Sequence, residues 1–372
     1  MWTIHGEQYD LTPLLRDHPG GEHILRLTEG TDCTALFESY HVFSDAPRAM
    51  LATYGPKYAG SGLDPMHAEI RGATRVLFGT RRAAKTPPLV MAALIGAQVS
   101  ALAFAAYYGT VLSAVVLGLV ISACATRTIH AASHYSGVLS PRANETIGEC
   151  VGMMLGFPYT AWVLGHVLSH HQYTNGERDV DTTVFRSKRR YAMALAPLPA
   201  SVSTALHVTA WSASMSSFAG AGGAYRARTV ARSVIATLAF HSTMAFLFAG
   251  WLRVWLISVY IGGSWFLFFA HLSHVASFGD ARGKTWSQAQ VLATENYEGA
   301  SRFWHFISFG LTNQIEHHLV PGVSDSHTWR IRGAVRAACA KYGVPYRDNS
   351  IWTATVRMVR ALARWARGYT PF

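Results

Sequence analysis

The sequence has little charge for its length. Only 14% of its 372 residues are Asp, Glu, Lys or Arg, and half are apolar, whereas an ordinary soluble domain has about 25% charged residues. This shortage disfavours a soluble enzyme. Acidic residues are scarcer than basic ones, which gives a net charge of +11. An excess of this sign suits nucleic acid or an anionic membrane surface. The apolar runs favour the membrane, and we expect no nucleic-acid partner.

Cysteine is scarce as well. The four cysteines, Cys33, Cys124, Cys150 and Cys339, show no C-x-x-C spacing, so we expect reduced thiols rather than a disulfide framework. The first residues, "MWTIHGEQYDLTP", lack the basic segment and apolar core of a signal peptide. We therefore expect the N-terminal region to stay on the cytosolic side.

Four long runs contain almost no charge, and each is near the roughly 20 residues that span a bilayer. They pair into two helical hairpins, 87–108 with 110–126 and 233–250 with 254–272. Two further apolar stretches, 147–164 and 191–215, are interrupted by prolines. We expect these to be interfacial or re-entrant, with a span as the alternative for one of them.

Arginine and lysine indicate the orientation of these spans. The loops inside the hairpins carry only Arg253, whereas the flanks are strongly basic, as cytosolic segments are. With four spans, the N-terminal region, residues 127–232 and the chain after about residue 275 all lie on the cytosolic face. The prediction is thus a small α+β domain, followed by an all-α integral membrane domain with a cytosolic cap.

The change in composition along the chain gives the domain boundaries. We predict an N-terminal domain at 1–58, a linker with a basic juxtamembrane segment at 59–86, and the membrane domain at 87–350. A basic amphipathic tail follows at 351–372.

Two histidines in the N-terminal domain stand on separate helix–turn segments. His18 begins an HPGG turn, and His41 follows in "FESYHVFS". Two histidines from separate helix–turn segments can bind one haem iron from both sides, which produces an electron carrier. The alternative is a turn residue and an unrelated surface residue. Residues 1–56, "IHGEQYDLTPLLRDHPGG" above all, resemble cytochrome b5. The resemblance implies that His18 and His41 are the axial ligands of haem b.

Three histidine boxes lie on the same predicted face as this domain. They read "HAASH", "HVLSHH" and "QIEHH" and contain His130, His134, His166, His170, His171, His317 and His318. The i, i+4 spacing puts two imidazoles on one face of an α-helix. Seven imidazoles exceed a four-coordinate zinc site and suit two iron ions.

Boxes, hairpins and haem domain together resemble the membrane fatty acyl desaturases, in particular the front-end group with a fused cytochrome b5. In that group the third box begins with Gln, as Gln314 does here. The resemblance implies that the seven box histidines bind iron. It also implies a further ligand near the end of the fourth span, where we favour His274 and keep His271 as the fallback.

Polar residues near the boxes have supporting roles by the same resemblance. The segment "TNGERDVD" implicates Asn175, Asp179 and Asp181 in orienting ligands, with a solvated loop as the alternative. The chemistry of Gln314 leaves two roles open, because its amide oxygen is either a weak metal ligand or a group that orients a water or a histidine.

The resemblance implies an O2-dependent desaturase that introduces a cis double bond into an already unsaturated acyl chain. The implied cofactors are a di-iron centre and haem b, with NADH electrons delivered through cytochrome b5 reductase. The implied substrate is a fatty acyl lipid or acyl-CoA, and the implied location is the endoplasmic reticulum membrane. Three alternatives stay open: a sphingolipid long-chain-base desaturase, a haem-fused lipid hydroxylase, and a membrane-anchored haem electron carrier with inactive iron boxes.

Overall fold

A computed structural model of the chain describes residues 1–55, 63–176, 178–179, 221–277 and 281–367. Asp181 and the apolar stretch 191–215 lie outside the described residues. Most of the remaining chain is helical, as the sequence predicts, and the few strands are short.

The N-terminal domain, here called the haem module, contains one antiparallel strand pair and three short helices. Trp2 pairs with Tyr9 across the strands, and both side chains are buried with Leu11 and Leu51 in a small separate core. The predicted α+β class of this module is confirmed. Its elements are β1 (Trp2–Ile4), β2 (Glu7–Tyr9), η1 (Thr12–Leu14), α1 (Glu22–Thr28), α2 (Thr34–Tyr40) and α3 (Ala46–Leu51).

The segment predicted as a linker contains a helix, α4 (Pro65–Phe78), followed by the short η2 (Arg82–Ala84). Asp64 begins α4 by accepting a hydrogen bond from the His67 backbone N–H at 2.9 Å. Met66 and Ile70 lie on one buried face of it, and α4 packs against α19. The structure differs from the prediction here because an apolar stripe with helical spacing runs between the arginines.

Four helices are long and apolar enough to cross a membrane, as predicted: Pro88–Tyr108, Val111–Ser133, Gly222–Leu247 and Trp251–His274. They correspond to α5 (Pro88–Tyr108), to α6 (Val111–Val120) continued by η3 (Ile121–Ala125) and α7 (Thr126–Ser133), and to α14 (Ala221–Leu247) and α15 (Trp251–His274). Helix α14 begins earlier than the predicted 233. The buried Arg226 is accommodated because its Nε–H donates to the Leu27 carbonyl of the haem module at 2.7 Å.

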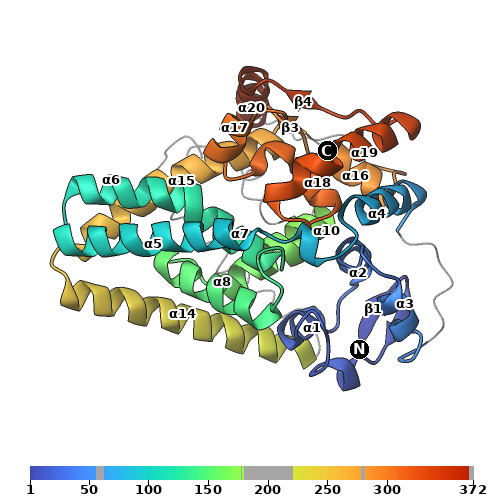
Figure 1. Cartoon of the computed structure of the whole chain (residues 1–372), viewed down its shortest axis with the longest axis horizontal. Coiled ribbons are helices and arrows are strands. Elements are labelled where there is room, and N and C mark those ends of the chain that lie inside the picture. Colours follow the sequence, from blue (N-terminus) through green and yellow to red (C-terminus); the bar gives the residue numbers. More distant parts are fainter. Residues whose placement is uncertain (56–62, 177, 180–220, 278–280, 368–372) are drawn as a thin grey trace.

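Both hairpin turns lie at one end of the molecule, and the haem module and the C-terminal elements lie at the other (Figure 1). At the hairpin end, Arg253 donates to the Gly109 carbonyl at 3.0 Å and so joins the two turns. The predicted clustering of the haem module and the histidine boxes at one end of the spans agrees with this arrangement.

A sharply bent pair of helices occupies the region around the predicted re-entrant stretch 147–164. Helix α8 (Pro141–Leu155) and the helical run Tyr159–Tyr173 meet at 104°, which is the geometry of a broken span or a re-entrant loop. The break follows from Gly156, which ends α8 with a positive φ, and from Pro158. The run after the break comprises α9 (Tyr159–Trp162), η4 (Val163–His170) and α10 (His171–Tyr173).

The C-terminal elements form a cap around the end of α15. Ile315, Leu319 and Val335 are fully buried in the core that this cap shares with α4. Strands β3 and β4 pair in parallel, and α20 packs on α15. The cap consists of α16 (Trp286–Ala293), β3 (Asn296–Tyr297), α17 (Arg302–Ile307), η8 (Leu311–Asn313), α18 (Gln314–Leu319), α19 (Asp325–Lys341), β4 (Asp348–Asn349) and α20 (Ile351–Ala366).

Candidate metal centre

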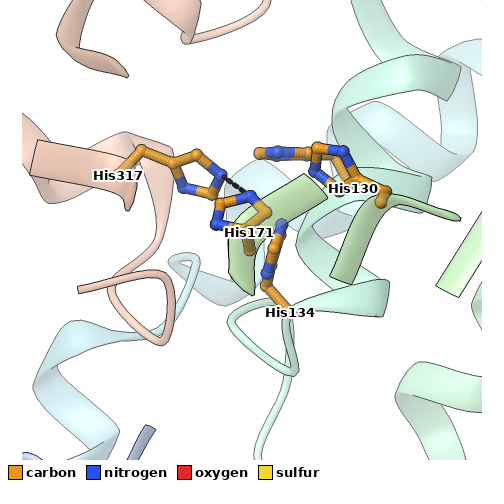
Figure 2. Close-up of side chains that lie close together, drawn as sticks. His130, His134, His171 and His317 are labelled. Atoms are coloured by element: carbon orange, nitrogen blue, oxygen red, sulfur yellow. Dashed lines mark hydrogen bonds between the residues drawn. The ribbon is translucent and has the colours of Figure 1, made fainter. Parts of the chain in front are cut away.

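The three boxes converge, and their histidines divide into two groups. The first, here called the five-histidine cluster, has all its ligand atoms within 4.8 Å of one another. Figure 2 shows four of its members meeting, from α7 and the residue after it, from α10 and from α18. The five are His130, His134, His166, His171 and His317.

The second group, the three-histidine cluster, consists of His170, His274 and His318 with the same close spacing of ligand atoms. It adjoins the first, since the rings of His171 and His318 stack with centroids 4.2 Å apart. The paired histidines of boxes two and three are therefore split: His170 and His318 face one cluster, and His171 and His317 face the other. Two adjacent residues on a helix point in different directions, so each pair contributes one histidine to each cluster.

The backbone of box two is a π-helix, and this decides which histidines meet. In η4 the backbone N–H of His171 bonds to the carbonyl of His166, five residues earlier. His166 and His171 consequently lie in one cluster, and His170 lies in the other. A second π-helix, η3, stands one turn before box one. Single π-helical turns recur at functional sites because they re-aim side chains within a continuous helix.

Hydrogen bonds at Nδ1 fix the orientation of four of these rings. The partners are the Tyr40 hydroxyl for His134 at 2.6 Å, Asp179 for His170 at 3.0 Å, the Ala293 carbonyl for His274 at 3.3 Å, and Gln290 Oε1 for His318 at 2.9 Å. Metal-binding histidines characteristically donate their other ring N–H in this way, which selects the tautomer with a free Nε2.

The opposite ring nitrogens fit a metal. Within the described part of the chain, the Nε2 atoms of His130, His134 and His318 are shielded from solvent and have no hydrogen-bond partner. A buried polar atom without a partner is costly, and a metal ion at each cluster removes that cost. Burial, followed by the repulsion of the neighbouring histidines, lowers the pKa of His134, His317 and His318 well below its usual value. The rings are thus neutral, which is the form that binds a metal.

Asn175 and Asp179 lie buried beside the three-histidine cluster. Asn175 adopts a positive φ of 57°, and its amide donates to the carbonyls of His274, Ser277 and Ala293 at 3.0–3.2 Å. Its backbone N–H donates to Asp179 Oδ2 at 2.7 Å, the oxygen that also faces His170. The segment after box two is consequently tied to the end of α15, and the alternative of a solvated loop does not hold for these two residues.

Asp179→Asn is expected to lower the rate of product formation by about 10- to 100-fold, the usual cost of losing the outer partner of a ligand histidine. The neutral amide no longer holds the His170 Nδ1–H with a charge-assisted bond. The measurement is the product fraction in membranes that contain equal amounts of each variant. Asp10→Asn, an exposed acid of the haem module, is the control, and equal product from the Asp179→Asn and wild-type chains would contradict the assigned role.

Gln314 lies at the edge of the three-histidine cluster. Its amide nitrogen is 3.2 Å from His274 Nε2, and its Oε1 is buried with no hydrogen-bond partner among the described residues. Nitrogen and oxygen of an amide are assigned from their surroundings, and a flip turns Oε1 toward His274 and the space that this cluster surrounds. The contact is compatible with both roles left open by the sequence.

Gln314→His is expected to lower activity by about tenfold, comparable with other changes next to metal ligands. The imidazole is bulkier than the amide and competes with His274 for the same space. Product fraction and non-haem iron content are measured together. A clear gain in activity, with iron retained, would contradict this expectation. It would show that glutamine is only a weaker metal ligand than histidine at this position.

The structure separates the two candidates at the end of α15. His274 lies in the three-histidine cluster, whereas His271, one turn earlier, belongs to neither cluster. The end of α15 is held in place because Asn175 donates to the His274 carbonyl and the His274 ring bonds to the Ala293 carbonyl.

The two histidines of the haem module face each other. Their ring centroids are 6.2 Å apart at 81°, a spacing that admits one iron between them, since a metal–imidazole bond is about 2 Å long. The Nδ1–H groups of His18 and His41 donate to the carbonyls of Gly21 at 3.1 Å and Phe37 at 2.8 Å, which leaves each Nε2 to bind. A side chain at Gly20 would begin 2.7 Å from the His18 ring, so the HPGG turn needs glycine there.

Several residues around the site were not predicted from the sequence. Gln290 joins two boxes, because it faces His318 with Oε1 and donates to the His171 carbonyl at 3.1 Å. Glu316 is fully buried and accepts hydrogen bonds from Asn296 at 2.8 Å and Tyr346 at 2.7 Å. The place of Glu316 inside the third box, directly before His317, was a usable indication. Nothing local distinguishes Gln290.

The fold and the site define a membrane protein in which a module with paired histidines is docked beside two histidine clusters. Comparison with known families identifies both parts. Residues 105–350 match the family described as fatty acid desaturase, and residues 1–55 match the cytochrome b5-like heme/steroid binding domain. The chain belongs to the fatty acid desaturase family and carries an N-terminal cytochrome b5-like domain, as the sequence motifs predict.

Relatives named as desaturases are similar over nearly the whole chain. An acyl-lipid omega-13 desaturase of Chlamydomonas reinhardtii is 25% identical, covering 95% of this chain and 91% of its own. A Delta(5) fatty acid desaturase A of Dictyostelium discoideum (95% and 88%) and an acyl-lipid (8-3)-desaturase of Mortierella alpina (95% and 90%) are each 26% identical. The protein is an oxidoreductase that acts on acyl lipids; its family implies iron and its N-terminal domain implies haem.

Proposed function

We propose that this chain is an O2-dependent front-end desaturase that introduces a cis double bond into an already unsaturated acyl chain. The observation that carries the proposal is the convergence of eight histidines in two adjacent clusters beside a docked module with paired histidines. The relatives named as Delta(5) and (8-3) desaturases support the front-end assignment.

The five-histidine and three-histidine clusters would each hold one iron ion, with Gln314 beside the second, and His18 and His41 would hold haem b. What a bound iron pair supplies is oxidation with O2 of a C–H bond that no acid or base can break. The chain's own contribution is positional. Asp179, Gln290 and the Ala293 carbonyl hold ring protons at Nδ1 and keep the Nε2 atoms aimed inward. Burial of the clusters excludes water from the reacting atoms.

Electrons would come from NADH through cytochrome b5 reductase, which would dock on the haem module. The substrate would be a fatty acyl lipid or acyl-CoA entering from the bilayer. We place the protein in the endoplasmic reticulum membrane with its haem module and histidine boxes on the cytosolic side. Supporting this, the hairpin turns lie at the opposite end of the spans, and the sequence around the boxes is rich in arginine.

The test is expression in a desaturase-deficient yeast that is fed saturated and unsaturated acyl chains as well as sphingoid bases, followed by lipid profiling. A new cis double bond in an unsaturated acyl chain is the expected result. A new bond confined to sphingoid bases, or a hydroxylated product, would replace the proposal with the corresponding lipid desaturase or hydroxylase. No new product with any substrate would contradict it altogether.

A further inference from the structure

One residue of the haem module touches a histidine of the metal centre. Tyr40 is the last residue of α2 and directly precedes His41. Its hydroxyl lies 2.6 Å from Nδ1 of His134, a residue 94 positions away in the five-histidine cluster. The two rings are nearly parallel, at 20°, with centroids 6.2 Å apart. The contact therefore crosses from one domain to the other.

The chemistry of this contact follows from the role of His134. Its Nε2 faces the cluster and has no hydrogen-bond partner in the described part of the chain. When Nε2 binds a metal, the ring proton sits on Nδ1 and is donated to the Tyr40 hydroxyl oxygen. The histidines of the other cluster receive the same support from Asp179, Gln290 and the Ala293 carbonyl, all within the desaturase domain. For His134 the support comes from the haem module.

Independent contacts hold the module in the position that this bond needs. Arg226 of α14 donates to the Leu27 carbonyl at 2.7 Å, and His23 Nδ1 is 2.9 Å from the Tyr225 hydroxyl. On the other side, Arg71 of α4 lies 3.4 Å from Glu38, a fully buried acid on α2 itself. The module is thus held through α1 on one side and through α2, the helix that carries Tyr40, on the other. In Figure 1 the module lies between α14 and α4.

We propose that Tyr40 is a positioning residue of the metal centre, so that the five-histidine cluster is complete only when the haem module is docked. This inference rests on the proposed function, because it assumes a metal at that cluster. It also joins the two cofactor sites physically. From His41 the chain runs through Tyr40 to His134 by covalent bonds and a single hydrogen bond. The module then serves the desaturase domain as part of its metal site as well as a donor of electrons.

The experiment uses the full-length chain with haem bound and its non-haem site loaded with ⁵⁷Fe. Tyr40→Phe removes only the hydroxyl and keeps the ring, and Tyr54→Phe makes the same change elsewhere in the module. In Tyr40→Phe we expect the half-life of the protein-bound non-haem iron, measured in the presence of a chelator, to fall by about tenfold. This is the low end of the cost of removing the hydrogen-bond partner of a metal-binding histidine. The haem spectrum should stay unchanged, and Tyr54→Phe should retain iron like the wild type.

Mössbauer spectra of the same samples separate positioning from packing. A role in positioning His134 changes the quadrupole splitting of one of the two iron sites in Tyr40→Phe, whereas a ring that only packs leaves both sites as in the wild type. The change is then combined with His134→Gln. If Tyr40 acts through His134, the double variant should lose iron no faster than His134→Gln alone. Equal iron retention and spectra in Tyr40→Phe and wild type, or additive losses in the double variant, would overturn the inference.

The two proposals fail in different ways in this experiment. A wild-type chain that holds haem but no ⁵⁷Fe contradicts the proposed function, and the inference falls with it. A wild-type chain that holds iron and forms product, alongside a Tyr40→Phe chain with identical iron retention, contradicts the inference alone.

Discussion

His274→Gln is expected to abolish desaturation, whereas His271→Gln, one helical turn earlier, leaves most of it. His274 is one of only three histidines in its cluster and lies next to Gln314. Its loss leaves two imidazoles, too few to retain iron. The expected fall in product exceeds about 100-fold, which is more than the fall caused by removing the hydrogen-bond partner of a metal-binding histidine. His271 belongs to neither cluster in the described structure, so the matched change should cost little.

Product fraction and non-haem iron are measured on both variants at equal protein level. His274→Gln should lose about half of its non-haem iron, since only the three-histidine cluster is damaged, and it should keep its haem. The reverse pattern, with His271→Gln inactive and His274→Gln active, would show that the end of α15 is turned the other way and that the assigned cluster is wrong.

His41→Ala is expected to abolish NADH-dependent desaturation while the non-haem iron remains bound. The change removes one of the two imidazoles that face each other across the proposed haem site. A haem held from one side has an open position and a different absorption spectrum. Burial and the neighbouring His18 already lower the pKa of His41 to about 4, so the ring is neutral and able to bind iron at every physiological pH. The measurement is the haem absorption spectrum together with product formed from NADH.

His23→Gln is the control within the module, since His23 bonds to Tyr225 rather than facing His18. It should keep the spectrum of the wild type. Full activity of His41→Ala in cells that lack other cytochrome b5 would show that the fused module is dispensable for electron delivery.

The sequence predicts the members of the metal site better than their grouping. Histidine boxes are visible because imidazoles are rare and their spacing is helical, and the four spans are visible because uncharged runs of that length are rare in soluble proteins. The i, i+4 rule nevertheless puts His166 with His170, and the structure puts His166 with His171. The π-helical backbone of η4 causes the difference, and no residue in the box indicates it.

Contacts between distant segments lie beyond sequence patterns. Tyr40 meets His134, and Asn175 meets the end of α15, only because the fold brings those segments together. Helix α14 likewise begins earlier than its apolar run, because carbonyl groups of the haem module satisfy Arg226. A charged residue would mark the end of a membrane span if the helix stood alone. It can lie within the helix when another domain supplies hydrogen-bond acceptors for it.

The most direct test of the account is the ratio of non-haem iron to haem in the purified full-length chain. Two clusters, each with one iron, and one pair of axial histidines predict two non-haem irons for every haem. The ratio is measured by total iron analysis combined with haem absorbance. A value of two supports the di-iron centre. Haem without non-haem iron, in protein that has not met a chelator, would contradict it and would identify the chain as a membrane-anchored electron carrier.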